Sequence, residues 1–170
     1  MGNRSLLFLF LLLLGVFLAV RHELPMKATI GVTNLIYGDE MSGIGGFRIL
    51  AELPNPEIRR EGLTDESVRG AMVAALAKAG VKSLTDELWR KTPGRPSLTV
   101  SVQAVKQAGG IYQYTVTIEA VRSEAEGALP GAEKSRTIWS AFKMGEGDIS
   151  DIRAKINEIT DLFLKARSAG

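Results

Sequence analysis

The sequence predicts an α+β fold: a two-layer sandwich with two helices packed on one face of a mainly antiparallel sheet of roughly three to five strands, preceded by an N-terminal hydrophobic helix. Three observations support this prediction. Two consecutive segments alternate apolar and polar residues, which is typical of strands with one buried face. Two other segments repeat apolar residues at spacings of three and four, which is typical of amphipathic helices. An uninterrupted apolar segment precedes all four.

The N-terminal hydrophobic segment covers residues 6–20, LLFLFLLLLGVFLAV. As a helix it would span about 22 Å, which lies on the border between a signal-peptide core and a membrane-spanning helix. Cleavage after Ala19 would place Phe17 at position −3, where a small residue is needed, so an uncleaved anchor is favoured over a cleaved signal peptide. The side chains expected in the bilayer include Leu6, Phe8, Phe10, Leu14, Phe17 and Val20.

The charges beside this segment are nearly balanced. Arg4 and the amino terminus lie on one side, and Arg21 and Lys27 lie on the other. Under the positive-inside rule the more basic flank stays in the cytoplasm, and a short N-terminal tail before a long domain usually stays there too. We therefore expect a protein that crosses the bacterial inner membrane once, with its C-terminal domain in the periplasm. The alternative is secretion to the periplasm after cleavage.

The chain divides into three predicted parts. Residues 1–21 form the membrane anchor or signal segment, residues 22–43 form a linker with a candidate first strand, and residues 44–170 form an α/β extracytoplasmic domain. Within the linker, Pro25 interrupts regular structure, and residues 28–37 alternate only weakly between apolar and polar side chains.

The domain opens with a strand and a helix. Residues 47–53, FRILAEL, form the first clear strand. The first long helix begins after Thr64, whose side chain suits the N-cap, and ends at Gly80, which suits the left-handed position after a helix. A short helical turn at residues 85–91 is expected to pack its leucine and tryptophan inward. The apolar stripe of the long helix contains Val68, Met72, Ala75, Leu76 and Ala79.

The clearest strands form a predicted antiparallel hairpin. Residues 98–104, LTVSVQA, and residues 112–120, YQYTVTIEA, each alternate with period two. Residues 107–110, QAGG, supply a tight turn between them. A further strand is expected at residues 135–144, before a last helix capped by Asp148. The apolar seam of that helix contains Ile149, Ile152, Ile156, Ile159 and Phe163.

Trp139 is the candidate partner contact. In the strand at residues 135–144, Ile138 and Phe142 share one face, whereas Trp139 and Ala141 share the other. If Ile138 and Phe142 face the helices, Trp139 points to the open face of the sheet, where a tryptophan would suit protein contact. A bulge that shifts the register, or a covering N-terminal strand, would instead bury it.

Few groups that support catalysis are present. The 170 residues include no cysteine and one histidine, His22, which lies in the linker. Thiol chemistry, zinc–thiolate sites and a Ser-His-Asp triad within the domain are therefore excluded. The net charge of +2 argues against a nucleic-acid partner. We expect no catalytic, cofactor-binding or metal site and no cofactor, and we predict that the chain is not an enzyme.

The element order resembles a type of exported bacterial α/β domain. Its segments are FRILAEL, LTDESVRGAMVAALAKAGV, SLTVSVQAVKQ, YQYTVTIEAV, TIWSAF and IRAKINEITDLFLKA. Over residues 44–167 the layout is similar to the amino-terminal domain of the Tol-system periplasmic protein and to lipoprotein activators of penicillin-binding proteins. The resemblance implies a protein-docking module of the cell envelope and carries no functional residue over. Those activators are lipid-anchored, whereas this chain has no cysteine to carry a lipid.

Together these features predict a non-catalytic, membrane-tethered interaction module outside the cytoplasm. It would bind the membrane through its N-terminal helix and a protein partner in the envelope, for example as an accessory or assembly subunit of a membrane-protein complex. The alternative is a secreted periplasmic carrier of a small apolar ligand, released by signal cleavage, which would need a deep apolar pocket between the helices and the sheet.

Overall fold

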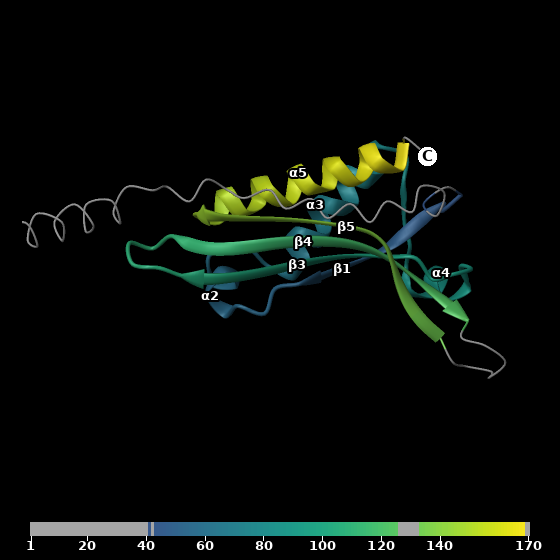
Figure 1. Ribbon diagram of the computed structural model, residues 1–170, viewed down its shortest axis with the longest axis horizontal. Coiled ribbons are helices and arrows are strands. Elements are labelled where there is room, and N and C mark those ends of the chain that lie inside the picture. The colour runs from purple at the N-terminus through teal and green to yellow at the C-terminus, as the bar shows by residue number, and fades with distance from the viewer. Residues whose placement is uncertain (1–40, 42, 126–132, 169–170) are drawn as a thin grey trace, which may run out of the picture.

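The computed structural model describes residues 41, 43–125 and 133–168 (Figure 1). The predicted hydrophobic helix with its anchor residues, His22, and the candidate strand at residues 28–37 lie outside these described residues. Among the helices that are described, none is both long and apolar enough to cross a membrane.

Five strands form one sheet in the order β2-β1-β3-β4-β5. β1 pairs in parallel with both β2 and β3, whereas β3 with β4 and β4 with β5 pair antiparallel. The α+β class is therefore confirmed, but the sheet is mixed, because two of its four strand pairings are parallel. The strands are β1 (Gly46–Glu52), β2 (Lys82–Ser83), β3 (Ser97–Lys106), β4 (Tyr112–Ala125) and β5 (Glu133–Gly147). The helices are α2 (Pro56–Arg60), α3 (Asp65–Lys78), α4 (Asp86–Lys91) and α5 (Ile149–Ser168).

β1 pairs in parallel with β2 and β3 because helices lie between these strands in the chain: α2 and α3 separate β1 from β2, and α4 separates β2 from β3. A parallel neighbour needs a crossover connection of about a dozen residues or more, usually with a helix. The alternation of residues in β1 identifies its buried face but does not identify the direction of the adjacent strand.

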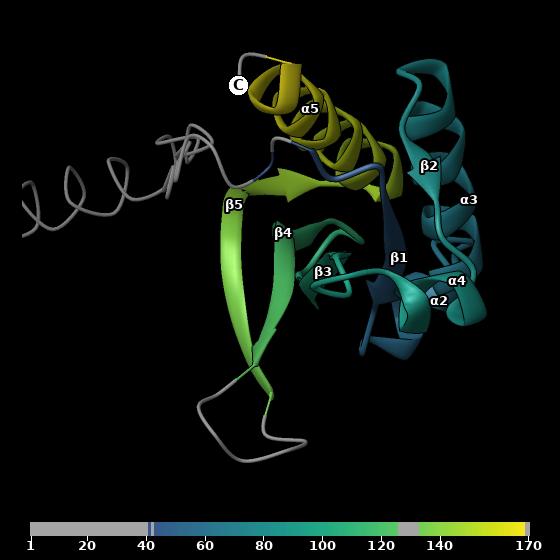
Figure 2. The ribbon, with the colours of Figure 1, turned by 90° about the vertical axis from the view of Figure 1, so that its right-hand side faces the viewer.

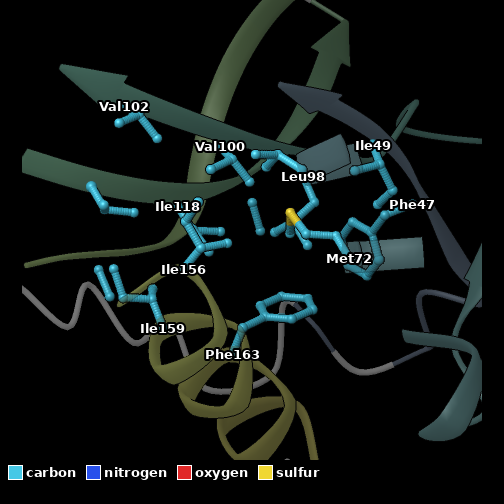
Figure 3. Close-up of a cluster of buried hydrophobic side chains, with 14 of the residues drawn as sticks. Phe47, Ile49, Met72, Leu98, Val100, Val102, Ile118, Ile156, Ile159 and Phe163 are labelled. Carbon is cyan, nitrogen blue, oxygen red and sulfur yellow. The ribbon is translucent and has the colours of Figure 1, made fainter. Parts of the chain in front are cut away.

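The two long helices cover the same face of the sheet (Figure 2). α3 packs against β1, α5 packs against β4 and β5, and the two helices contact each other. Their predicted apolar stripes point into one core, shown in Figure 3, where α3 contributes Met72 and α5 contributes Ile156 and Phe163. The sheet therefore has one face covered by α3 and α5 and one open face.

The predicted hairpin is confirmed. β3 and β4 pair antiparallel from Ser97 opposite Val121 to Lys106 opposite Tyr112. In the turn, Gly109 and Gly110 have φ angles of +86° and +83°, a backbone conformation that glycine adopts without a steric penalty. The two glycines between the alternating segments therefore do what the sequence predicts.

Trp139 does not lie on the open face and is therefore not an exposed partner contact, because the alternative of a bulge that shifts the register is the one observed. Ala120 pairs with Trp139 but Val121 pairs with Thr137, so Ile138 is an extra residue in a β-bulge. The bulge brings Ile138 and Trp139 into the core together, each 1% exposed. Beyond the bulge the alternation is reversed from that expected, and Phe142 therefore lies on the open face.

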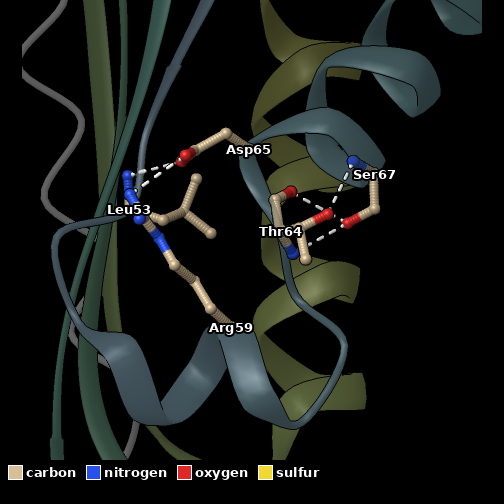
Figure 4. A network of polar contacts seen from close by, with 5 residues as sticks. All are labelled: Leu53, Arg59, Thr64, Asp65 and Ser67. Atoms are coloured by element: carbon tan, nitrogen blue, oxygen red, sulfur yellow. Dashed lines mark hydrogen bonds and ion pairs between the residues drawn. The ribbon is translucent and has the colours of Figure 1, made fainter.

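A polar network joins the end of β1 to the start of α3 (Figure 4). The Asp65 Oδ1 atom accepts a hydrogen bond from the buried backbone N–H of Leu53 (3.0 Å), and its Oδ2 atom pairs with Arg59 (3.0 Å). Thr64 and Ser67 form a capping box, in which each side chain accepts the backbone N–H of the other. These contacts hold the helix start at the point where the chain leaves the sheet.

Replacing Asp65 by alanine leaves the buried Leu53 N–H without its acceptor. We expect Asp65→Ala to lower the free energy of unfolding by about 1–3 kcal/mol, measured by urea unfolding of the full-length chain in mild detergent. Glu66→Ala is the matched control, because Glu66 is exposed in the same first helical turn and feels the same helix dipole. Equal losses for the two variants would contradict the assigned role of Asp65.

Candidate functional site

The open face of the sheet is polar but carries few charges over its central strands. Side chains alternate along a strand, so the residues between the buried positions of β3 and β4 point to this face. Short hydroxyl and amide side chains dominate it there, and Glu119 adds a carboxylate. The uncharged positions are Thr99, Ser101, Gln103, Gln113, Thr115 and Thr117.

A group of exposed apolar side chains lies where the open face meets the hairpin turn. Val105, Ile111 and Met144 are 64%, 42% and 46% exposed, and they are three of the four large hydrophobic side chains that are exposed among the described residues. Val105 is opposite Gln113 across β3 and β4, and Met144 is opposite Thr115 across β4 and β5. Phe142, half-buried, precedes Met144 on the same face. We call Val105, Ile111, Phe142 and Met144 the hairpin patch.

The other face of the sheet holds the hairpin in place behind this patch. Glu61, just after α2, accepts hydrogen bonds from Lys106 Nζ (2.7 Å) and from the Tyr112 hydroxyl (2.8 Å). These two hydrogen bonds lower the pKa of Glu61, and the one from Lys106 has the larger effect. Asn55 also donates its side-chain amide to the Ala104 carbonyl (2.7 Å). α2 is thereby fastened to the strands that carry Val105 and Ile111.

The outer strand β5 carries two features that disfavour pairing with another strand along its edge. One is the bulge at Ile138. The other is Lys143, whose side chain points inward, is 12% exposed and is paired with Glu158 of α5. That hydrogen bond and a second one from Lys155 lower the pKa of Glu158. A partner is therefore better accommodated on the open face than by adding a strand to β5.

A shallow groove of about 460 Å³ runs between α3 and α5. Its α3 side consists of alanines, including Ala71 and Ala75, and Lys78, and its α5 side includes Asn157 and Asp161. The groove lies between the helices, whereas the core side chains lie between the helices and the sheet. The predicted carrier function requires a deep apolar pocket in that second space, so the groove does not match it.

The residues singled out from the sequence are not brought together. Trp139 is buried, and the anchor residues and His22 lie outside the described residues. Over residues 43–125 and 133–168, the structure shows no cluster of acidic and histidine side chains arranged to hold a metal ion.

Sequence reasoning missed the β5 part of the hairpin patch, because the exposure of Phe142 and Met144 depends on the bulge in β5. The signal available was the shared parity of Phe142 and Met144, two apolar residues separated by one position. Without the bulge, that parity places both among the core positions. A search with protein-family models, a search of curated proteins and a search of solved structures found no match to this chain.

The Glu61 contacts make the hairpin sensitive to acid. The folded state lowers the pKa of Glu61, so its stabilising contribution is present above the unfolded value of about 4.3 and is lost as the pH falls through the folded pKa. We expect Glu61→Gln to have a lower urea midpoint than the parent at pH 7. The difference should shrink as the pH falls from about 4.3 through the lowered pKa of the folded state, because the parent carboxylate then becomes protonated too.

Glu57→Gln is the control for this measurement, since Glu57 is exposed on the adjacent α2 and the substitution removes the same charge. If the difference in urea midpoint between the parent and Glu61→Gln is the same at pH 7 and below about pH 4, the charge of Glu61 does not stabilise the hairpin.

Proposed function

We propose that the chain is a non-catalytic, membrane-tethered interaction module outside the cytoplasm, which binds an envelope protein through the hairpin patch and the adjoining open face of the sheet. An accessory or assembly subunit of a membrane-protein complex fits this description. The hydrophobic segment at residues 6–20 supports the tether, and the layout shared with envelope docking domains supports the class of function.

The observation that carries the proposal is the group of exposed apolar side chains at one end of a polar face that carries few charges over β3 and β4. Exposed apolar patches rimmed by polar residues are typical of protein-binding sites. The centres of such interfaces are depleted in lysine, glutamate and aspartate, as β3 and β4 are on this face. Serine and threonine also lose little conformational entropy when they are covered, which favours binding.

The fold separates this surface from the core that stabilises the domain. Val105 and Met144 are largely exposed and contribute little to the core, so they can be changed without unfolding the domain. The contacts of Glu61 with Lys106 and Tyr112 keep the patch in one arrangement, which reduces the entropy lost on binding.

Placing a charge in the patch should abolish partner binding. We expect Val105→Lys and Met144→Lys each to weaken the complex by about tenfold or more, as substitutions at interface centres do. The measurement is the fraction of the full-length chain that migrates in a complex larger than the monomer, on native gels of membranes solubilised in mild detergent. Thermal unfolding of each variant should match the parent.

Ala77→Lys is the matched control, because Ala77 is exposed on α3, on the helix-covered side of the sheet. It should leave the complex intact. The proposal fails if the native chain runs only as a monomer, or if Ala77→Lys disrupts the complex as strongly as the two patch variants.

A further inference from the structure

The end of the sheet opposite the hairpin gathers several separate segments (Figure 1). Ser123, near the end of β4, donates its N–H to the carbonyl of Gly94 in the loop between α4 and β3 (2.7 Å). Arg167, in the last turn of α5, donates to the carbonyl of Ile44 just before β1 (2.9 Å). The start of β1, α4, the end of β4 and the end of α5 therefore lie at the same end of the sheet (Figure 1).

Cations are concentrated at this end, which we call the basic end. The two acids of α4 are paired there, Asp86 with Arg48 (2.8 Å) and Glu87 with Lys91 (2.6 Å). Further out along β5, Lys134 and Arg136 add two more cations. The other cations of the basic end give it a positive charge: Lys82, Arg90, Arg95, Arg122, Lys165 and Arg167.

The basic end also has a hollow suited to a phosphate group. The loop between α4 and β3 surrounds a hollow of about 320 Å³, which is lined by Arg90, Lys91 and Arg95 together with Ser123. Lysine and arginine side chains are the usual donors to phosphate oxygens.

An exposed leucine accompanies these cations. Leu88 on α4 is 54% exposed, contrary to the expectation that it packs inward. Its neighbour Trp89 fixes α4 to the domain through two contacts. The guanidinium carbon of Arg48 lies 4.7 Å from the centroid of the Trp89 ring, and Trp89 Nε1 donates a hydrogen bond to the Arg95 carbonyl (2.8 Å). Leu88 is therefore held outward, three residues before Lys91 on the same side of the helix. An apolar side chain beside cations is typical of surfaces that enter the headgroup region of a bilayer.

The chain enters the domain at this same end. β1 starts at Gly46, and the linker from Arg21 to that point can reach at most about 90 Å when fully extended. The linker therefore joins the domain at the basic end, whereas the hairpin patch lies at the opposite end of the sheet.

We propose that the basic end is the membrane-facing surface of the domain, where its cations bind the phosphates of anionic lipid headgroups and Leu88 enters the interface. This inference rests on the proposed membrane tether. It orients the domain so that the hairpin patch points away from the membrane, toward a partner.

The test uses the absence of cysteine, because one introduced cysteine takes a single fluorescent label. The full-length chain is labelled at Pro93→Cys on the basic end or at Gln107→Cys in the hairpin turn, both exposed positions. It is then reconstituted into vesicles that contain an acceptor-labelled lipid. Energy transfer should be higher from position 93 than from position 107. When phosphatidylglycerol is added to phosphatidylcholine, energy transfer should increase several-fold more at position 93 than at position 107. High salt should abolish this increase.

Charge-reversed variants complete the experiment. Lys82→Glu/Arg90→Glu should remove the effect of phosphatidylglycerol, whereas Arg60→Glu/Arg153→Glu should keep it, because these exposed positions on α2 and near the start of α5 change the net charge equally and lie away from the basic end. Equal transfer in neutral and anionic vesicles would overturn the proposal and assign these cations to another anionic partner, such as an acidic protein surface. A chain that fails to float with any vesicle would overturn the tether as well, so the two failures are distinguishable.

Discussion

The packing of Phe163 organises the domain. Its ring makes edge-to-face contacts with Phe47 of β1 at 5.3 Å and with Trp139 of β5 at 5.2 Å, so one side chain of α5 bridges from an inner strand to the outer strand of the sheet. All three side chains are at most 1% exposed. Aromatic pairs of this kind add about 0.5–1.5 kcal/mol each to the burial of their apolar area. This contact determines which face of the sheet the last helix covers.

Once α5 is on that face, the properties of both faces follow. The bulge at Ile138 turns Trp139 toward Phe163, and the reversed alternation leaves Phe142 and Met144 on the open side. The buried side supplies stability, and the open side is left free of α3 and α5. The two ends of the sheet also differ, since one carries the hairpin patch and the other carries the basic end and receives the chain from its N-terminal segment.

Local periodicity was enough to predict most of the elements. The hairpin, the Thr64 cap of α3 and the seam of α5 depend on residues close together in the chain, and each was found where expected. The parallel pairing of β1 was not predicted, because alternation is the same in parallel and antiparallel strands. For Trp139 the sequence left two orientations open, and the observed one depends on a single extra residue in β5, which reverses every later side chain. The exposure of Phe142 and Met144 depends on that register, so the β5 part of the hairpin patch could be recognised only in three dimensions.

The central claim is that the two faces of the sheet have separate roles, one in stability and one in binding. Two phenylalanines that belong to opposite faces test it most directly: Phe163, fully buried on α5, and Phe142, half-buried on β5. In urea unfolding, Phe163→Ala should lower the free energy of unfolding by about 3–5 kcal/mol, whereas Phe142→Ala should lower it by about 1 kcal/mol or less. Losses of similar size at the two positions would contradict the separation of the faces.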